Sequence, residues 1–184
     1  MRKGVAILAG LIILALANYS IYSRERLLTE GNVVFLQLAP IDPRSLMQGD
    51  YMALRFQVAN DVRSRVTDEL PRDGFAVLKL DERRIGTLAR VDDGKPLAAN
   101  EARMRYRMRD KQIKFATNAF FFQEGDAQLY GNARYGEFRV DAGGDSILTS
   151  MRDEHLGLLG LGREGTPHEG VPVFSHKGRR VEQG

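Results

Sequence analysis

The residues with the clearest chemical potential form an alternating run of arginines. The run reads Arg103, Met104, Arg105, Tyr106, Arg107, Met108, Arg109. On a β-strand, successive side chains point to opposite faces, so the four guanidinium groups would share one face. Such a face could bind anionic lipid headgroups, an envelope polymer or an acidic partner surface. The alternative is a solvated face that blocks edge pairing, with the arginines paired to carboxylates: Asp81, Glu82, Glu137 or Asp141.

Residue types that usually hold metals or act as nucleophiles are scarce. The chain has no cysteine, which excludes disulfides, thiolate ligands and cysteine nucleophiles. His155, His168 and His176 lie in a glycine-rich tail, where a preorganised metal site is not expected. No glycine-rich phosphate loop and no Gly-x-Ser-x-Gly elbow is present. We therefore expect no cofactor and no metal ligand, and enzyme activity lacks support.

The N-terminal segment has the pattern of a membrane-spanning helix. Arg2 and Lys3 precede a stretch, residues 4–22, that carries no charge. As a helix with about 1.5 Å per residue, this stretch would span roughly 28 Å, close to the thickness of a bilayer core. Tyr19 and Tyr22 suit the far interface, where an aromatic ring meets both lipid and headgroups. The pattern indicates an anchor over residues 1–23, followed by a juxtamembrane linker over 24–32.

A cleaved signal peptide is the alternative, because residues 15–17 read Ala-Leu-Ala, a small-x-small cleavage pattern. Both interpretations give the same direction. Arg2 and Lys3 stay in the cytoplasm, while Arg24 and Arg26 are offset by nearby glutamates. We therefore expect a single-pass protein of a bacterial inner (cytoplasmic) membrane, with its C-terminal domain in the periplasm or outside.

The remainder of the chain predicts a mainly β domain over residues 33–154. Alternating or β-branched runs predict strands near residues 33–38, 51–58, 75–80, 85–91, 103–109, 113–122, 134–140 and 146–151. A spacing of four between apolar residues predicts one short helix within 60–70. We expect a β-rich α+β fold, either a sandwich or a partly open barrel. From residue 155 the chain becomes rich in glycine and proline, which predicts a largely flexible tail over 155–184.

Three consecutive phenylalanines, residues 120–122, are expected to lie mostly in the core, with strand alternation leaving one ring at the surface. That ring could contact a membrane or a partner protein. The formal net charge of +3 is too small to indicate nucleic-acid binding.

The stretch Gly49-Asp50-Tyr51-Met52-Ala53-Leu54-Arg55-Phe56 resembles the signature Gly-Asp-Tyr-x-x-Leu-x-Tyr. This signature names a family of membrane-anchored bacterial and archaeal proteins. The upstream segment 40–44 and the later segment 121–125 also resemble the family pattern, so the likeness covers roughly residues 5–150. Phe56 replaces the final tyrosine and retains only its packing role. The resemblance implies one anchor plus one domain, and a partner among multi-pass membrane proteins.

Two interpretations of this stretch go beyond packing. Asp50 could bind a ligand or partner, although an aspartate after glycine more commonly accepts hydrogen bonds from its own turn. The pattern before Gly49 also resembles signal-peptidase and LexA-type serine peptidases, which use a serine nucleophile and a lysine base. In this chain Ser45 and Lys79 would fill those positions, but Ser45 lies too close to Asp50 for that pattern.

The sequence thus favours a membrane-anchored, extracytoplasmic protein that acts as an accessory or scaffold for an integral membrane partner, with self-association as a further option. The alternatives are a Ser45/Lys79 hydrolase and an anion binder that uses Arg103 to Arg109. We expect no catalytic residues, and the motif residues Gly49, Asp50, Tyr51, Leu54 and Phe56 identify a family rather than a reaction.

Overall fold

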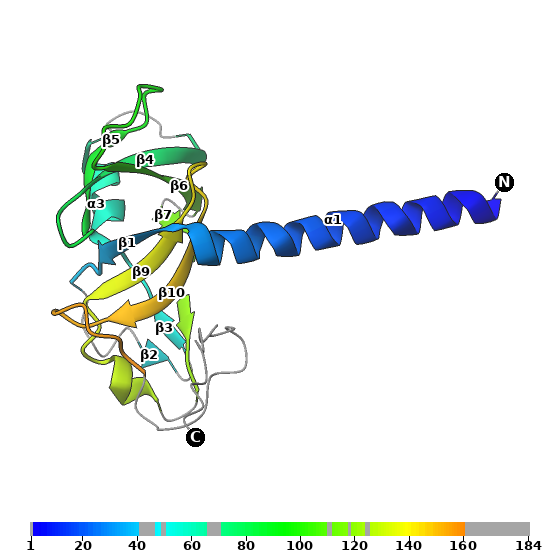
Figure 1. The fold of residues 1–184 in the computed structure, drawn as a ribbon. Coiled ribbons are helices and arrows are strands. Elements are labelled where there is room, and N and C mark those ends of the chain that lie inside the picture. Colours follow the sequence, from blue (N-terminus) through cyan, green and yellow to red (C-terminus); the bar gives the residue numbers. More distant parts are fainter. Residues whose placement is uncertain are drawn as a thin grey trace, which may run out of the picture.

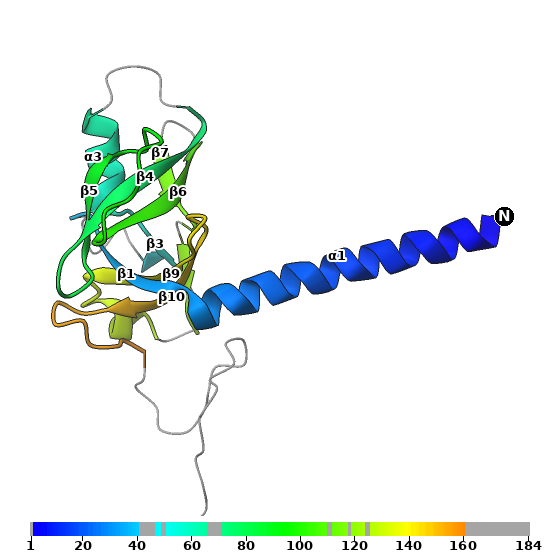
Figure 2. The ribbon, with the colours of Figure 1, turned by 45° about the horizontal axis from the view of Figure 1, so that its top comes forward.

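The computed structural model describes residues 2–40, 47–48, 51–65, 71–109, 112–117, 119–123 and 126–160. Its first element is the helix α1 (Arg2–Glu30), which projects from one side of a β-rich domain (Figures 1 and 2). Within α1, the segment Ile7–Glu30 is long and apolar enough to cross a membrane, with a mean hydropathy of 1.4 in its most apolar window. A signal sequence near the N-terminus passes the same test.

The described residues of the domain form three antiparallel sheets. The first has the order β1-β9-β10 and consists of β1 (Asn32–Gln37), β9 (Tyr135–Val140) and β10 (Ser146–Arg152). The second has the order β5-β4-β6-β7 and consists of β4 (Asp73–Leu80), β5 (Gly86–Val91), β6 (Glu101–Arg109) and β7 (Gln112–Phe115). The third has the order β2-β3-β8 and consists of β2 (Met47–Gln48), β3 (Tyr51–Ala53) and β8 (Ala119–Phe121). In Figure 1, the β1-β9-β10 sheet lies between the other two.

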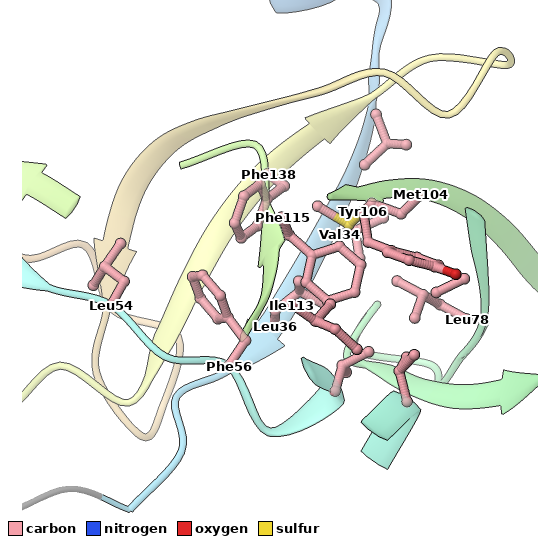
Figure 3. Packing of buried hydrophobic residues seen from close by; sticks show 14 of the residues in the cluster. Val34, Leu36, Leu54, Phe56, Leu78, Met104, Tyr106, Ile113, Phe115 and Phe138 are labelled. Carbon is pink, nitrogen blue, oxygen red and sulfur yellow. The ribbon is translucent and has the colours of Figure 1, made fainter. Parts of the chain in front are cut away.

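The sheets curl strongly into a half-barrel around one core, which confirms the predicted mainly β fold with an N-terminal apolar helix. Two isolated bridges connect this region with neighbouring parts of the chain: Phe35 in β1 pairs with Ile85, and Leu38, directly after β1, pairs with Phe56. Inward-facing residues of β1, β4, β6, β7 and β9 fill the interior (Figure 3). The alternation of β6 is the one that the sequence predicts, because Met104 and Tyr106 are fully buried while Arg105 and Arg107 are exposed.

The strand expected over residues 51–58 is shorter than its alternation suggests. Strand β3 ends at Ala53, and the helix α3 (Gln57–Arg65) begins where the strand was expected to continue. The apolar residues nevertheless all face the core, because Leu54 and Phe56 are buried in the connection and Val58 is buried on α3. Residues spaced by two in a strand and by four in a helix can thus serve one core across a change of structure.

The predicted strand over residues 113–122 is also interrupted. β7 ends at Phe115, and Ala116 has a φ of 43°, in the left-handed region that non-glycine residues rarely adopt. The chain then enters β8, which belongs to a different sheet. A short 3₁₀ helix, η1 (Ala127–Tyr130), follows, and its buried Tyr130 packs against the rings of Phe120 and Phe122.

Helix α1 joins the domain without an intervening extended segment. Leu27, near the end of α1, is only 6% exposed, and α1 contacts β9 and β10. The Gly31 N–H donates to the Leu27 carbonyl, the Arg139 guanidinium donates to the Gly31 carbonyl at 3.2 Å, and β1 starts at the next residue. The last turn of α1 is therefore part of the folded domain.

Candidate functional site

The described residues of the signature stretch divide into a buried part and a surface part. Leu54 and Phe56 are almost fully buried, and the Phe56 ring meets the Phe138 ring edge-on at a centroid distance of 5.2 Å. Tyr51 is half-buried on β3. Gly49 and Asp50 lie outside the described residues, so the two interpretations of Asp50 stay predictions. The packing role of Leu54 and Phe56 follows directly from their burial.

Tyr51 pairs in register with Phe121 on the neighbouring strand β8. The two rings lie with centroids 5.9 Å apart. Phe121 is 74% exposed and is the most exposed large apolar side chain in the described part of the chain. The expectation that one of the three phenylalanine rings would reach the surface is therefore confirmed. Tyr51 and Phe121 together form an aromatic surface patch beside the buried half of the signature.

The four arginines of β6 share one face of the strand but do not form one site. Arg103 is the first of the four and already has partners. Its guanidinium lies 3.3 Å from Asp92 Oδ2 and 5.1 Å from the centroid of the Phe75 ring. Arg105 also lies over Phe75, at 5.2 Å, and pairs with Asp145 at 3.1 Å. Arg107 pairs with Asp73 at 3.7 Å. For Arg109 no ion pair is seen among the described residues.

The carboxylates that pair with these arginines differ from those expected. Asp73, Asp92 and Asp145 hold them, whereas the sequence suggested Asp81, Glu82, Glu137 or Asp141. Glu137 is instead buried and paired with Arg152 on β10. Asp81 and Asp141 accept hydrogen bonds from the backbone of their own turns. These turns need the carboxylates locally, because Asp at the start of a turn binds the N–H groups that follow it.

Arg105, Arg107 and Arg109 line a cleft between the end of α1 and the β6–β7 hairpin. The cleft has a volume of about 590 Å³. Its helical wall consists of Tyr19, Ser20, Ser23, Arg24 and Leu27, and Arg103 is not part of its lining. Spacings of one, four, five and eight place these residues on one face of α1. That face carries hydroxyl groups and a guanidinium, in contrast to the apolar segment before it.

The lining of this arginine cleft has more positive than negative charge. Among the described residues, five cationic side chains (Arg24, Arg105, Arg107, Arg109 and Lys114) and two carboxylates (Asp141 and Asp145) line the cleft, and these seven groups have a formal charge of +3. The Asp141 carboxylate accepts the backbone N–H of Asp145 at 2.9 Å, so its own turn already uses it. Asp145 is 59% exposed, which weakens its pairing with Arg105.

Two cations of the cleft lie directly opposite each other. Arg107 on β6 and Lys114 on β7 are partners in the antiparallel register. Like charges opposite each other on neighbouring strands destabilise a sheet, so this arrangement needs a compensating negative charge. The Asp73 carboxylate offers little compensation, because it lies 3.7 Å from Arg107 and both side chains are more than 60% exposed. The arrangement is thus suited to binding an anion.

The geometry does not support the interpretation of Ser45 and Lys79 as a catalytic pair. Lys79 is exposed on β4, whereas a lysine base needs a desolvated environment. Ser45 lies outside the described residues, so its distance to Lys79 stays untested. His155 is exposed, and His168 and His176 are not described. Among the described residues, no group of three His, Asp or Glu side chains is placed to hold a metal ion.

Sequence reasoning identified three of the five cations in the described lining of the cleft and missed Arg24 and Lys114. Each had a signal. Arg24 is the first charged residue after the apolar segment, and it shares a helical face with Ser20 and Ser23. Lys114 lies opposite Arg107 once β6 and β7 are paired in antiparallel register. The Phe75 ring under two arginines had no comparable signal, because it depends on the β4–β6 register.

Comparison with known proteins supports the resemblance found in the sequence. No curated protein and no solved structure gives a significant match to the chain. A family model does match, described as GDYXXLXY protein, and it covers residues 13–151, from the apolar part of α1 to the end of β10. The match includes the signature stretch, the cleft and the aromatic patch. The chain belongs to the GDYXXLXY protein family.

Proposed function

We propose that this protein is a single-pass protein of a bacterial inner membrane, with its β-rich domain on the outer side. In this proposal the domain acts as an accessory or scaffold for an integral membrane partner. The observation that carries it is the continuity of α1 with the domain, since Leu27 belongs to the last turns of the helix and to the packing of the fold. A helix joined in this way would hold the domain at a fixed height and orientation beside a membrane.

The distribution of charge supports the orientation. Arg2 and Lys3 precede the apolar segment, and after it Arg26 pairs with Glu30 one helical turn away at 2.7 Å. Segments rich in Lys and Arg stay in the cytoplasm, so the proposal places the end with Arg2 and Lys3 on that side. Tyr19 and Tyr22 are exposed on α1 and suit the outer interface.

The aromatic patch supports the choice of a protein partner. Phe121 is exposed next to Tyr51, and aromatic residues are enriched at the centres of protein interfaces. β8 is an edge strand of its sheet, so a partner could also reach its backbone. We assign the patch to an integral membrane protein, because a domain fixed beside the bilayer by α1 meets such proteins at the height of its own surface.

The orientation can be tested with cysteine labelling, because the natural chain has no cysteine and gives no background. Glu82 is exposed in the turn between β4 and β5, so Glu82→Cys should accept a membrane-impermeant maleimide in intact cells with a permeabilised outer layer. Equal labelling before and after lysis is the expected result. Labelling only after lysis would overturn the proposed orientation. N-terminal sequencing of the mature protein shows whether α1 is retained or cleaved after Ala17.

The partner can be tested by site-specific photo-crosslinking in membranes. A photoreactive amino acid at position 121 should give an adduct with a multi-pass membrane protein, identified by mass spectrometry. The same group at Lys79, an exposed position on β4, is the matched control and should not give that adduct. Adducts between two copies of this chain would mean that the aromatic patch binds a second copy and not an integral membrane partner. Failure to obtain any protein adduct at position 121 would overturn the docking proposal.

A further inference from the structure

We infer that the arginine cleft binds the phosphodiester headgroup of an anionic membrane lipid. The inference rests on the membrane anchor of the proposed function and is independent of the protein partner. Its starting point is the joint presence of Arg24 from α1 and three arginines from β6 around one cleft of about 590 Å³. Residues far apart in sequence thus place positive charge at the point where the helix meets the domain.

The position of the cleft along α1 matches the height of lipid headgroups. Its helical wall starts at Tyr19, in the last part of the uncharged segment 4–22, and ends at Leu27, beyond that segment. Tyrosines of membrane helices lie at the interface between hydrocarbon and water. The β6–β7 hairpin provides the opposite wall through Arg107 and Lys114. A phosphate at the interface would therefore lie between the helix and this hairpin.

The chemistry of the wall suits a phosphodiester. Guanidinium groups present planar pairs of N–H donors that match phosphate oxygens. In the described part of the chain, the carboxylates paired with Arg105 and Arg107 are exposed, so an incoming anion can replace them at small cost. A phosphate between Arg107 and Lys114 would also remove the repulsion between these two directly opposed cations. Ser20 and Ser23 add hydroxyl groups on the helical side.

The surroundings favour a lipid over a free anion or a soluble polymer. The helical wall of the cleft continues without a break into the exposed apolar residues of α1, among them Leu16 and Ile12. Acyl chains can lie against these side chains while the headgroup reaches the arginines. The volume of the cleft falls within the usual range for small-molecule sites, about 300–1,000 Å³, which is larger than one phosphate needs.

The test uses the purified full-length chain in a neutral detergent. Phosphatidylglycerol is titrated, and bound lipid is counted by native mass spectrometry. The triple variant Arg105→Gln, Arg107→Gln, Lys114→Gln should bind phosphatidylglycerol about a hundredfold more weakly than the natural chain, because it lacks three cations that each contribute on the order of 1 kcal/mol near an anionic lipid. Phosphatidylcholine, which carries no net charge, should bind the natural chain and the variant equally weakly.

Two controls separate the cleft from general charge and from folding. The triple variant Arg55→Gln, Lys79→Gln, Arg83→Gln removes the same number of charges from exposed positions that do not line the cleft, and it should bind like the natural chain. Arg24→Gln changes a side chain on α1, outside the sheets, and should weaken binding while the melting temperature of the domain stays the same. The inference would be overturned if the cleft triple variant and Arg24→Gln bound phosphatidylglycerol as tightly as the exposed-charge control variant.

Competition distinguishes the possible anions. Inorganic phosphate and soluble poly(glycerol phosphate), each added at the phosphate concentration of the lipid, should fail to displace phosphatidylglycerol. Displacement by inorganic phosphate would reassign the cleft to a free anion, and displacement by the polymer alone would reassign it to an envelope polymer. Either result overturns the lipid assignment. Because no partner protein is present in this assay, its outcome is independent of the crosslinking experiment at Phe121.

Discussion

The hydroxyl of Tyr106 on β6 lies directly above Gly74 on β4. The two residues are partners across the antiparallel pair, and a Cβ atom added at Gly74 would lie 2.5 Å from Tyr106 Oη. Tyr106 is completely buried, and its hydroxyl has no hydrogen-bond partner among the described residues. Burial accordingly raises the pKa of Tyr106 above its ordinary value. The tyrosine ring thus occupies the space that the missing side chain of Gly74 leaves, in the sheet that carries the four arginines.

Removal of this hydroxyl should not harm the fold. A buried polar group without a partner costs about 1–3 kcal/mol, so Tyr106→Phe should leave the free energy of unfolding unchanged or raise it by about 1 kcal/mol. Chemical denaturation of the full chain in detergent, followed by far-UV circular dichroism, measures the change. A loss of more than about 1 kcal/mol would mean that the hydroxyl is bound to a neighbour.

Addition of a methyl group at Gly74 should have the opposite effect. The new Cβ would lie 2.5 Å from Tyr106 Oη and 2.6 Å from Cζ, so the ring must move within a filled core. Overpacking of this kind costs about 1–3 kcal/mol, and Gly74→Ala should lower the free energy of unfolding by that amount. Gly131→Ala is the matched control, because Gly131 has right-handed helical angles and its nearest new contact is at 3.4 Å. Equal stability of the two variants would contradict the close packing at Gly74.

Local patterns predicted much of this fold. The alternation in β6 predicted which residues are buried and which are exposed, and the three phenylalanines of residues 120–122 predicted one exposed ring. These features depend on neighbours in sequence, where the period of two is decisive. The N-terminal helix followed from an uncharged segment that needs no tertiary contact.

Other features depend on contacts that a local pattern does not contain. The apolar residues from Met52 to Val58 fit a single strand, yet the chain enters α3 at Gln57, where packing against β5 and β7 replaces strand pairing. The cleft requires that Leu27 docks the end of α1 on the domain, which sets the distance between Arg24 and β6. Tertiary packing decides both cases, because it outweighs local propensity.

The ion pair of Glu137 is expected to stabilise the domain. Glu137 is the one charged residue that is buried in the described part of the chain, and it accepts hydrogen bonds from Arg152 Nε at 2.7 Å and Ser150 Oγ at 2.8 Å. Glu137→Gln removes the charge that Arg152 needs, and it should cost about 1–3 kcal/mol, below the range for a fully buried pair because Arg152 is partly exposed. Thermal or chemical unfolding measures this loss.

An exposed pair provides the comparison for Glu137. Arg26 and Glu30 are more than 60% exposed on α1, so Glu30→Gln should leave the free energy of unfolding of the domain unchanged within the error of the measurement. If Glu30→Gln and Glu137→Gln had equal effects, burial would not be the reason for the stability of the Glu137 pair.

Variants of two phenylalanines can distinguish a role in folding from the proposed role in partner binding. Phe56 belongs to the signature and is buried against Phe138, so Phe56→Ala should leave a cavity and lower the free energy of unfolding by about 3–5 kcal/mol. Phe121→Ala truncates a ring that is 74% exposed and should change the free energy of unfolding by less than about 0.5 kcal/mol.

Co-purification from crosslinked membranes then measures partner binding by each folded variant. Phe121→Ala should lose the partner at unchanged stability, whereas Phe56→Leu, which retains most of the buried volume, should keep it. A partner that binds Phe121→Ala as well as the natural chain would place its docking surface away from the aromatic patch.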